Sequence, residues 1–376
     1  MKKIDYTYVD NSDLLRKIVF QISKASELGV DLEADSMFHY QEKVCILQLS
    51  SKSANFIIDT LAVKDLSPLK RIFSDPKIKK IFHGADYDIR SLKRDFNIEI
   101  QGLFDTQIAA RFIGVKETGL ANLLNLKLGI SLEKKYQKKD WSQRPLNEKM
   151  ISYAVNDSLH LIKLARNLEY ELIKLGRLSY AQEEFETLSK VRYEPKKQVP
   201  IFLNFNGAGS LDRRSLAVLE ELLIYRQKQA RRLDRPPFKV MGNSPILDLV
   251  KKKPKTIEEL KLIKGLSPKQ IDNFGGHILK RVLKALAVPE HMLPFYPTKN
   301  RNFMDGKTSK RIKTLKKWRE RKASELGIDP PLVFSNAAIR PIAVNCPSNQ
   351  EGLKRISELR RWQIKEFGEE ICALIS

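Results

Sequence analysis

Five side chains in the first half of this chain have types and spacings that could support metal-dependent hydrolysis. Asp31 and Glu33 are two residues apart in a run where apolar and polar residues alternate, so both carboxylates project from one face of a predicted strand. Adjacent carboxylates repel each other unless a cation bridges them, and hard oxygen ligands suit Mg²⁺ or Mn²⁺. Considered alone, the pair is explained equally well by a solvated strand face.

A second candidate carboxylate lies where an apolar stretch ends in a turn at His83-Gly84 and leads into a predicted helix. Asp86 has Arg90 at i+4, which is the spacing of an ordinary surface ion pair. Asp88 borders the apolar side of the same helix, so we expect Asp88 to be the functional carboxylate. We interpret His83 as a packing residue rather than a ligand.

A third candidate pair is Tyr153 and Asp157, whose i, i+4 spacing stacks a phenol and a carboxylate on one helix face. The same predicted face carries Met150, Leu161 and Leu164. A carboxylate in an apolar stripe is costly unless something pairs with it, and a metal ion would do so. The alternatives are an aspartate satisfied by backbone amides or a lysine, and a tyrosine that only packs.

The elements that must position these residues form a mixed pattern from Tyr6 to about Leu126, which becomes purely helical beyond Thr106. Short apolar runs predict strands at 28–34, 44–49 and 56–58, followed by another that ends at Phe82. Helical patterns cover 12–25, 66–74 and 86–96. We therefore expect an α/β domain in which helices flank a mixed β-sheet.

The rest of the chain is predicted to be helical and contains an internal repeat. Tyr225-Arg226 recurs as Trp318-Arg319, and Phe274-Gly275 recurs as Phe367-Gly368, and the offset across the repeat is 93 or 94 residues. Turn-forming residues without a sustained period separate the parts. The predicted parts are a domain at 1–190, a linker at 191–209, a helical module at 210–288, a linker at 289–308 and a second module at 309–376.

The net charge of +23 is concentrated in the second half of the chain. Residues 1–190 carry 30 Lys and Arg against 26 Asp and Glu, whereas residues 191–376 carry 38 against 19. Such a positive field attracts polyanions, and its usual partner is nucleic acid. A basic domain without such a partner is the alternative.

Other features of the composition narrow the class of protein. No stretch reaches the roughly 18 apolar residues of a membrane span, and the first residues lack an apolar signal core. The three cysteines, Cys45, Cys346 and Cys372, show no metal or disulfide spacing. We therefore expect a cytoplasmic protein without a membrane partner.

Taken in order, Asp31-x-Glu33, His83-Gly84 with Asp88, and Tyr153-x-x-x-Asp157 resemble the three exonuclease motifs of the DEDD superfamily, in its tyrosine branch. Two further sequence segments are similar to segments of the ribonuclease D family. They are Phe104-Asp105-Thr106 and Asp140-Trp141-Ser142-Gln143-Arg144-Pro145-Leu146. We interpret Asp105-Thr106 as an ordinary helix N-cap. The repeated module resembles the HRDC domain. The resemblance covers nearly the whole chain and implies an RNase H-like α/β exonuclease domain followed by two all-α HRDC domains.

The second module departs from the first in one turn. It has Glu358-Leu359-Arg360 where the first has Gly265-Leu266-Ser267. If that glycine turn contacts phosphate in the first copy, the second copy is expected to contribute packing rather than binding.

The resemblance also implies a site and a reaction. Asp31, Glu33, Asp88 and Asp157 are expected to hold two Mg²⁺ (or Mn²⁺) ions, whose charge the four carboxylates offset. Tyr153 is expected to orient or deprotonate the attacking water. The implied activity is a 3′-5′ exoribonuclease that releases nucleoside 5′-monophosphates, with maturation of tRNA precursors as its implied role. We also expect a monomer.

Two other functions use the same residues. A 3′-5′ DNA exonuclease of proofreading or repair type needs the same carboxylates, but no polymerase-length region follows and no G-x-x-x-x-G-K-[ST] loop is present. A catalytically silent nucleic-acid-binding protein would be expected to lack a carboxylate of the set, and none is missing. Both observations favour the RNA enzyme.

Overall fold

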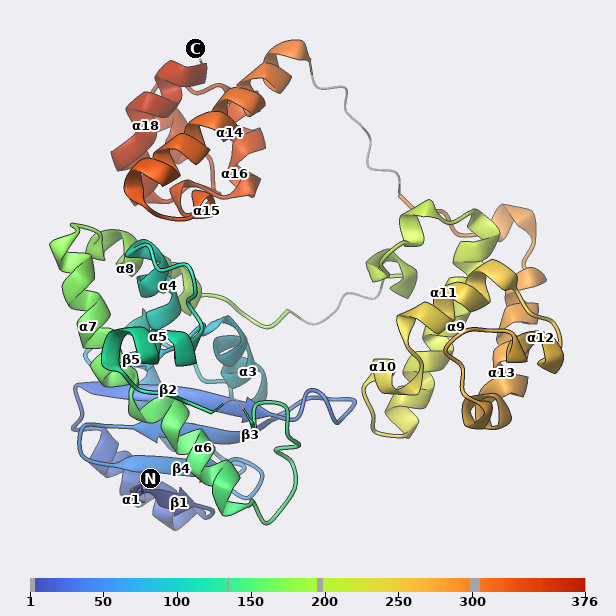
Figure 1. Ribbon diagram of the computed structural model, residues 1–376, viewed down its shortest axis with the longest axis horizontal. Coiled ribbons are helices and arrows are strands. Elements are labelled where there is room, and N and C mark those ends of the chain that lie inside the picture. The colour runs from blue at the N-terminus through green and yellow to red at the C-terminus, as the bar shows by residue number, and fades with distance from the viewer. Residues whose placement is uncertain (1–3, 134, 195–198, 298–304, 376) are drawn as a thin grey trace. The chain divides into compact units, whose positions relative to one another are not determined.

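The structure, a computed structural model, describes residues 4–133, 135–194, 199–297 and 305–375 (Figure 1). The chain divides into two compact units. The sheet unit comprises residues 1–34, 43–193 and 303–376, and the helical unit comprises residues 35–42 and 194–302. Within the described ranges, no helix combines the length and apolarity that crossing a membrane requires.

A six-stranded mixed sheet forms the centre of the sheet unit, in the order β1-β4-β3-β2-β5-β6. The strands are β1 (Thr7–Val9), β2 (Glu27–Ala34), β3 (Val44–Ser50), β4 (Asn55–Asp59), β5 (Lys79–Phe82) and β6 (Leu103–Asp105). The central pairs β2–β3 and β3–β4 are antiparallel, and the outer pairs β1–β4, β2–β5 and β5–β6 are parallel. The predicted RNase H-like α/β fold is confirmed.

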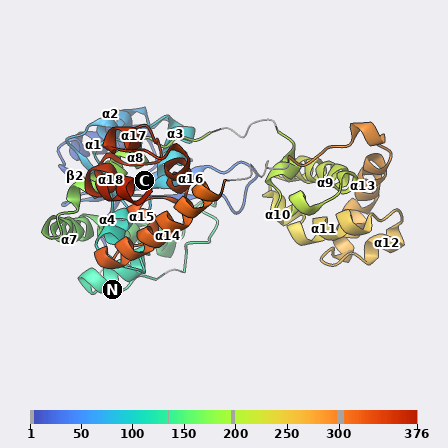
Figure 2. The ribbon, with the colours of Figure 1, turned by 90° about the horizontal axis from the view of Figure 1, so that it is seen from above.

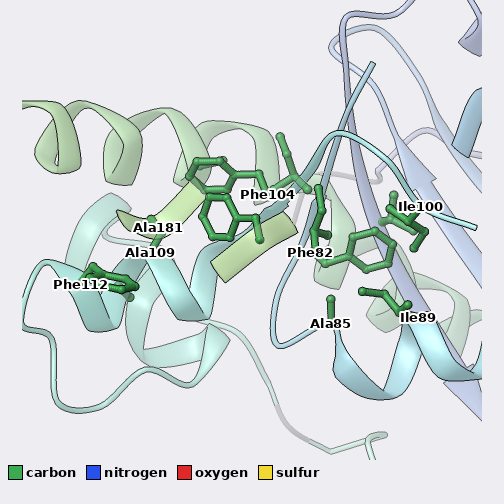
Figure 3. Packing of buried hydrophobic residues seen from close by; sticks show 14 of the residues in the cluster. Phe82, Ala85, Ile89, Ile100, Phe104, Ala109, Phe112 and Ala181 are labelled. Atoms are coloured by element: carbon green, nitrogen blue, oxygen red, sulfur yellow. The ribbon is translucent and has the colours of Figure 1, made fainter. Parts of the chain in front are cut away.

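Helices cover both the sheet and its ends in the first half of the chain. They are α1 (Ser12–Ile22), η1 (Ser67–Leu69), α2 (Lys70–Ser74), α3 (Asp86–Phe96), α4 (Thr106–Phe112), α5 (Leu120–Leu128), α6 (Glu148–Leu159), α7 (Leu161–Lys174) and α8 (Leu178–Ser189). Every residue of β3 is buried, as expected for a central strand with both faces covered. Figure 3 shows how Phe82 and Ala85 pack beside Ile89 of α3, which fixes this helix against the sheet.

One prediction about the helices is wrong. The sequence pattern placed Leu161 and Leu164 on the same helix as Tyr153, but α6 ends at Leu159 and α7 begins at Leu161. The break at His160 is consistent with the packing of α7 against β2, where Leu161 lies close to Gly29. Leu161 and Leu164 are both fully buried in the core of the sheet unit.

The second helical module belongs to the sheet unit and consists of α14 (Gly306–Leu326), α15 (Pro330–Val333), α16 (Asn336–Asn345), α17 (Gln350–Lys354) and α18 (Arg361–Ile375) (Figure 2). Trp362 at the start of α18 stacks on Tyr180 of α8 with ring centroids 4.5 Å apart, and meets the edge of Phe112 at 5.6 Å. Glu183 of α8 accepts hydrogen bonds from the backbone amides of Arg361 and Trp362 at 2.8 and 2.9 Å. One hydrophobic core therefore runs through both parts of this unit.

The helical unit contains the first helical module. Its elements are η2 (Ile201–Asn204), η3 (Ala208–Ser210), α9 (Arg213–Arg232), α10 (Pro237–Val240), α11 (Asn243–Lys252), α12 (Ile257–Lys261), α13 (Pro268–Leu286) and η4 (Glu290–Met292). The prediction of a linker at 191–209 is wrong for residues 201–209, which contain η2 and most of η3. Phe202, Phe205 and Ala208 from this segment are buried in the same core as α9.

The two modules repeat the same internal contacts. Asp212 caps α9 by accepting from Ser215, and Asp305 caps α14 by accepting from Thr308. An arginine then braces the following turn in each copy. Arg226 donates to the Met241 carbonyl and the Asn243 side chain, and Arg319 donates to the Phe334 carbonyl and the Asn336 side chain. These pairs all keep the offset of 93 residues, so the repeat is structural.

Candidate active site

Three of the predicted carboxylates converge although they are far apart in the chain. Asp31 and Glu33 lie on β2 and Asp157 lies on α6, and one carboxylate oxygen from each lies within 4.8 Å of the others. Asp31 and Glu33 share a face of the strand because they are two residues apart. The register of β2 against β3 shifts between Glu33 and Ala34, a local irregularity of the kind that re-aims side chains next to active sites.

Asp88 of α3 is the fourth acidic residue at this place. Its side chain is buried, and its charge acts on both Asp31 and Glu33. It is outside the group of three whose oxygens lie within 4.8 Å of one another. Asp86, by contrast, accepts a hydrogen bond of 2.8 Å from Arg90 on the protein surface. The geometry thus separates the two aspartates as the helical spacing suggested.

The turn that aims α3 is held by Asp105 at the end of β6. This fully buried carboxylate caps α4 by accepting from the amides of Gln107 and Ile108, at 2.8 and 3.0 Å. It also accepts from the amides of Gly84 and Ala85, at 3.2 and 2.7 Å. Asp105 is therefore the predicted N-cap, and in addition it ties the turn after β5 to the start of α4.

His83 lies in the same turn and contacts the start of α4. Its Nδ1 is 2.9 Å from the hydroxyl of Thr106. Burial lowers the pKa of His83 below its ordinary value, while the nearby charge of Asp105 opposes this shift. A neutral, hydrogen-bonded imidazole fits the packing role assigned to it.

Asp157 reaches the strand because α6 approaches β2 very closely. A Cβ at position 29 would lie 2.5 Å from the carbonyl oxygen of Ser158, so only glycine fits at this point of β2. The Ser158 hydroxyl also pairs with that of Ser50 on β3 at 2.7 Å, and both side chains are buried. These two contacts fix the residue next to Asp157 against both strands.

Tyr153 lies one helical turn before Asp157, and its hydroxyl donates a hydrogen bond to the Asp157 carboxylate. Its ring contacts those of Tyr136 and Trp141, with centroids 6.0 and 6.2 Å away. Burial and the charges of Asp157 and Glu33 raise the pKa of Tyr153 above its ordinary value. The phenol is thus held neutral, as a hydrogen-bond donor pointing at the carboxylates.

The loop that carries Trp141 is anchored by an ion pair between Arg144 and Asp59. The guanidinium binds both carboxylate oxygens, at 2.5 and 2.7 Å, and also donates to the carbonyls of Trp141 and Cys45. Tyr8 donates to the same carboxylate at 2.6 Å. Burial tends to raise the pKa of Asp59, but the bonds from Arg144 and Tyr8 outweigh it and leave the pKa lowered. The loop behind Tyr153 is therefore fixed to β4.

Withdrawal from water raises the pKa of all four carboxyl groups. For Asp31 and Glu33 the charges of Asp157 and Asp88 raise it further, well above the ordinary value. The pKa of Asp88 rises to about 7 through burial and the charges of Asp105 and Asp86, and that of Asp157 rises to about 7 through burial, against the opposing bond from Tyr153. Such crowded anionic oxygens are the donors that hard divalent cations prefer, so the residues fit a metal site.

The sequence analysis did not identify several residues that build this site. They are Gly29, Gln48, Ser50, Asp59 and Ser158. Gln48 pairs across the sheet with Asp31 and places its amide nitrogen 3.5 Å from that carboxylate. Two signals were present in the sequence, since Gln48 and Ser50 are polar residues in a buried strand and Gly29 interrupts another. Asp59 carried no signal, because its partner Arg144 is distant in the chain.

Comparison with known proteins agrees with this geometry. Residues 6–173 match the 3′-5′ exonuclease domain family, and residues 215–282 and 309–375 each match the HRDC domain family. Among curated proteins, the chain is similar to a ribonuclease D of Desulfotalea psychrophila, with 29% identity over 337 residues that cover 89% of each protein.

Two solved structures are also similar. The catalytic core of RRP6 from Trypanosoma brucei is 30% identical, with a TM-score of 0.68 over 76% of this chain and 80% of that one. RNase D of Escherichia coli, described as an exoribonuclease involved in structured RNA processing, is 25% identical with a TM-score of 0.73 over 99% of both chains. The similarity to RNase D of Escherichia coli thus extends over nearly the whole of this chain, including both helical modules.

Proposed function

Because this chain is a 3′-5′ exoribonuclease that belongs to the ribonuclease D family, we propose that Asp31, Glu33, Asp88 and Asp157 form its catalytic metal site. The observation that carries the proposal is the convergence of Asp31, Glu33 and Asp157, whose oxygens lie within 4.8 Å of one another. Asp88 belongs to the same set because its negative charge raises the pKa of the carboxyl groups of Asp31 and Glu33.

The four carboxylates suit two divalent cations, Mg²⁺ or Mn²⁺. Four negative charges offset two ions of charge +2, and this relieves the repulsion that raises the pKa values of the carboxyl groups. When bound, such ions would supply electrostatic stabilisation of the charge that develops on the phosphate during hydrolysis. A phosphodiester can reach the site because Asp31, Glu33 and Asp157 are only partly buried residues.

Tyr153 orients the attacking water. Its hydroxyl is neutral at physiological pH and is aimed by its bond to Asp157, while Tyr136 and Trp141 hold the ring. A phenol in this position donates its one hydrogen to Asp157 and can accept a hydrogen bond from the attacking water. Products are nucleoside 5′-monophosphates, released one at a time from the RNA 3′ end.

The basic second half of the chain binds the body of the substrate. Phosphate contacts by lysine and arginine position an RNA without reading its sequence. We assign catalysis to residues 1–190 and substrate binding to the modules at 210–288 and 309–376. The natural substrates are proposed to be tRNA precursors, processed in the cytoplasm by a monomer.

The test compares Asp88→Asn and Asp157→Asn with the matched control Asp86→Asn, which removes a charge two residues from the site. Shortening of a 5′-labelled RNA should require Mg²⁺, stop on addition of chelator, and be lost in the first two variants by about a thousandfold or more. The control should keep its activity because Asp86 pairs with Arg90 on the surface. Circular dichroism checks that all three are folded. Full activity of Asp157→Asn would remove this residue from the site and overturn the proposal.

A further inference from the structure

The long helix α14 of the second module carries an unusual concentration of positive charge. Its sequence contains nine lysines and arginines against two glutamates. Lys310, Lys313 and Lys317 follow one another at intervals of three and four residues, so they lie on one face of the helix. All three side chains are exposed. At 1.5 Å per residue the row is about 10 Å long.

These lysines differ from the cations at the other end of the same helix. Lys322 pairs with Glu370 at 2.9 Å and with Glu325 at 3.3 Å, and Arg321 pairs with Glu325 at 3.6 Å. Within the described part of the chain, no ion pair is formed by Lys310, Lys313 or Lys317. The positive field of this row is therefore not offset by neighbouring carboxylates.

The internal repeat shows that the row is not required by the module's fold. The capping contacts at Asp212 and Asp305 align α9 with α14 at an offset of 93 residues. At this offset, the three lysines correspond to Ala217, Glu220 and Ile224 of α9. The same helix in the same kind of module therefore has no cation at any of the three positions.

The corresponding face of α9 has another use. Ala217 is buried, and Glu220 accepts from the backbone amides of Ile201 and Phe202 at 3.0 and 2.9 Å. The segment that contains Phe202, Phe205 and Ala208 covers α9 there and joins its core. In the first module this helix face supports the module's own chain, whereas in the second it is exposed and basic.

The second module is firmly attached to the exonuclease part of the sheet unit through the opposite end of α14. Arg177 donates to the carbonyl of Leu326, the last residue of α14, at 2.7 Å, and Arg111 lies 3.6 Å from Asp329. The lysine row begins sixteen residues before Leu326, so the three lysines take no part in this contact. An RNA bound to the row would be held by the same compact unit that carries the four carboxylates.

We infer that Lys310, Lys313 and Lys317 form a binding surface for the sugar-phosphate backbone of the RNA substrate. The inference rests on the proposed function, since it assigns part of the substrate to this face. It places the substrate binding that we propose for the second module at one end of α14, whereas the packing contacts use the other end. Three charged contacts of this kind bind without sequence preference and weaken as salt rises.

The experiment compares the full-length triple variant Lys310→Gln, Lys313→Gln, Lys317→Gln with a control triple variant, Lys17→Gln, Lys64→Gln, Lys77→Gln. The control removes the same charge from exposed lysines elsewhere in the sheet unit. Affinity for a fluorescent single-stranded RNA oligomer is measured by anisotropy in chelator, over a range of salt concentrations. Hydrolysis of a ribodinucleotide is measured separately with Mg²⁺.

The α14 variant should bind the oligomer at least about tenfold more weakly than the control variant at low salt, and its salt slope should fall by about 2, since each lost contact contributes roughly 0.7 for a single strand. Its dinucleotide hydrolysis should equal that of the wild type, because so short a substrate needs only the active site. Equal affinities and slopes in the two triple variants would overturn the inference. Failure of the wild type to hydrolyse RNA would instead remove the proposed function, and the two failures are therefore distinct.

Discussion

Gly29 of β2 and Ser158 of α6 approach each other so closely that a Cβ at position 29 would lie 2.5 Å from the Ser158 carbonyl oxygen. This contact sets the distance between α6 and the sheet. Because Asp157 is the neighbour of Ser158, and Asp31 is two residues beyond Gly29, the same contact sets the spacing between two of the carboxylates.

Gly29→Ala should therefore impair both folding and catalysis. The methyl group forces α6 away from β2, and overpacking of this kind typically costs about 1 to 3 kcal/mol of stability. RNA hydrolysis should fall more than RNA binding does, because Asp157 moves relative to Asp31 and Glu33. Chemical denaturation and single-turnover hydrolysis measure the two effects. Gly119→Ala is the control, since nothing lies within 4 Å of a Cβ there, and equal behaviour of the two variants would refute this account.

Much of the arrangement of the candidate site could be predicted because the spacing of its residues along the chain determines which face each occupies. The two-residue spacing of Asp31 and Glu33 on a strand and the four-residue spacing of Tyr153 and Asp157 on a helix each fix a shared face. The position of Asp88 on the apolar side of α3 distinguished it from Asp86 in the same way. The short strands β1 and β6 carried no comparable signal, since three residues cannot establish a period.

Contacts between distant parts of the chain that lie outside the three exonuclease motifs could not be predicted. The pairing of Arg144 with Asp59 and the docking of Trp362 between Tyr180 and Phe112 depend on tertiary packing alone. The wrong extension of α6 through Leu161 has the same origin. Its apolar period continues past His160, whereas the chain turns there and Leu161 packs against β2 within the next helix.

Trp362→Ala should loosen the second module from the rest of the sheet unit. The indole is 5% exposed and contacts aromatic rings on both α4 and α8, so its removal should cost about 3 to 5 kcal/mol. Limited proteolysis should then release a fragment that begins near α14. Trp318→Ala serves for comparison because Trp318 packs on Phe334 and Phe367 inside the module. If Trp362→Ala stays resistant to protease while Trp318→Ala does not, the docking contact contributes little.

Lys80 should make stability depend on pH in the alkaline range. Its side chain is fully buried in β5, where it donates to the carbonyls of Asp75 and Ile72 at 2.6 and 3.3 Å. Burial lowers its pKa to about 8 from an ordinary value of 10.5, against the opposing charge of Asp75. Between these values the unfolded chain binds a proton that the folded chain does not, so the free energy of unfolding should rise with pH.

Urea denaturation of the wild type and of Lys80→Met at pH values from about 8 to 10 tests this dependence. The free energy of unfolding of the wild type should increase relative to that of Lys80→Met as pH rises, because methionine cannot titrate. Below about pH 8 both states of the wild type carry the charge, and the difference should become constant. If the unfolding free energies of the two proteins change with pH in parallel across the whole range, the buried amine keeps an ordinary pKa.

Tyr153→Phe isolates the role of one hydroxyl group at the site. The ring contacts with Tyr136 and Trp141 remain, so the variant should fold with nearly unchanged stability. The bond to Asp157 is lost, and with it the group that orients the attacking water. The rate constant for hydrolysis should fall by about a hundredfold or more, within the range attributed to positioned proton-transfer groups.

Binding measurements complete this test. The affinity of Tyr153→Phe for an RNA oligomer in chelator should match that of the wild type, because the hydroxyl contacts a carboxylate rather than the α14 surface. The stabilisation of the folded protein by bound Mn²⁺ should also persist, since all four carboxylates are intact. If Tyr153→Phe loses Mn²⁺ stabilisation and hydrolysis rate to the same extent, Tyr153 acts by holding Asp157 in place for the metal. If only the hydrolysis rate falls, Tyr153 acts on the attacking water.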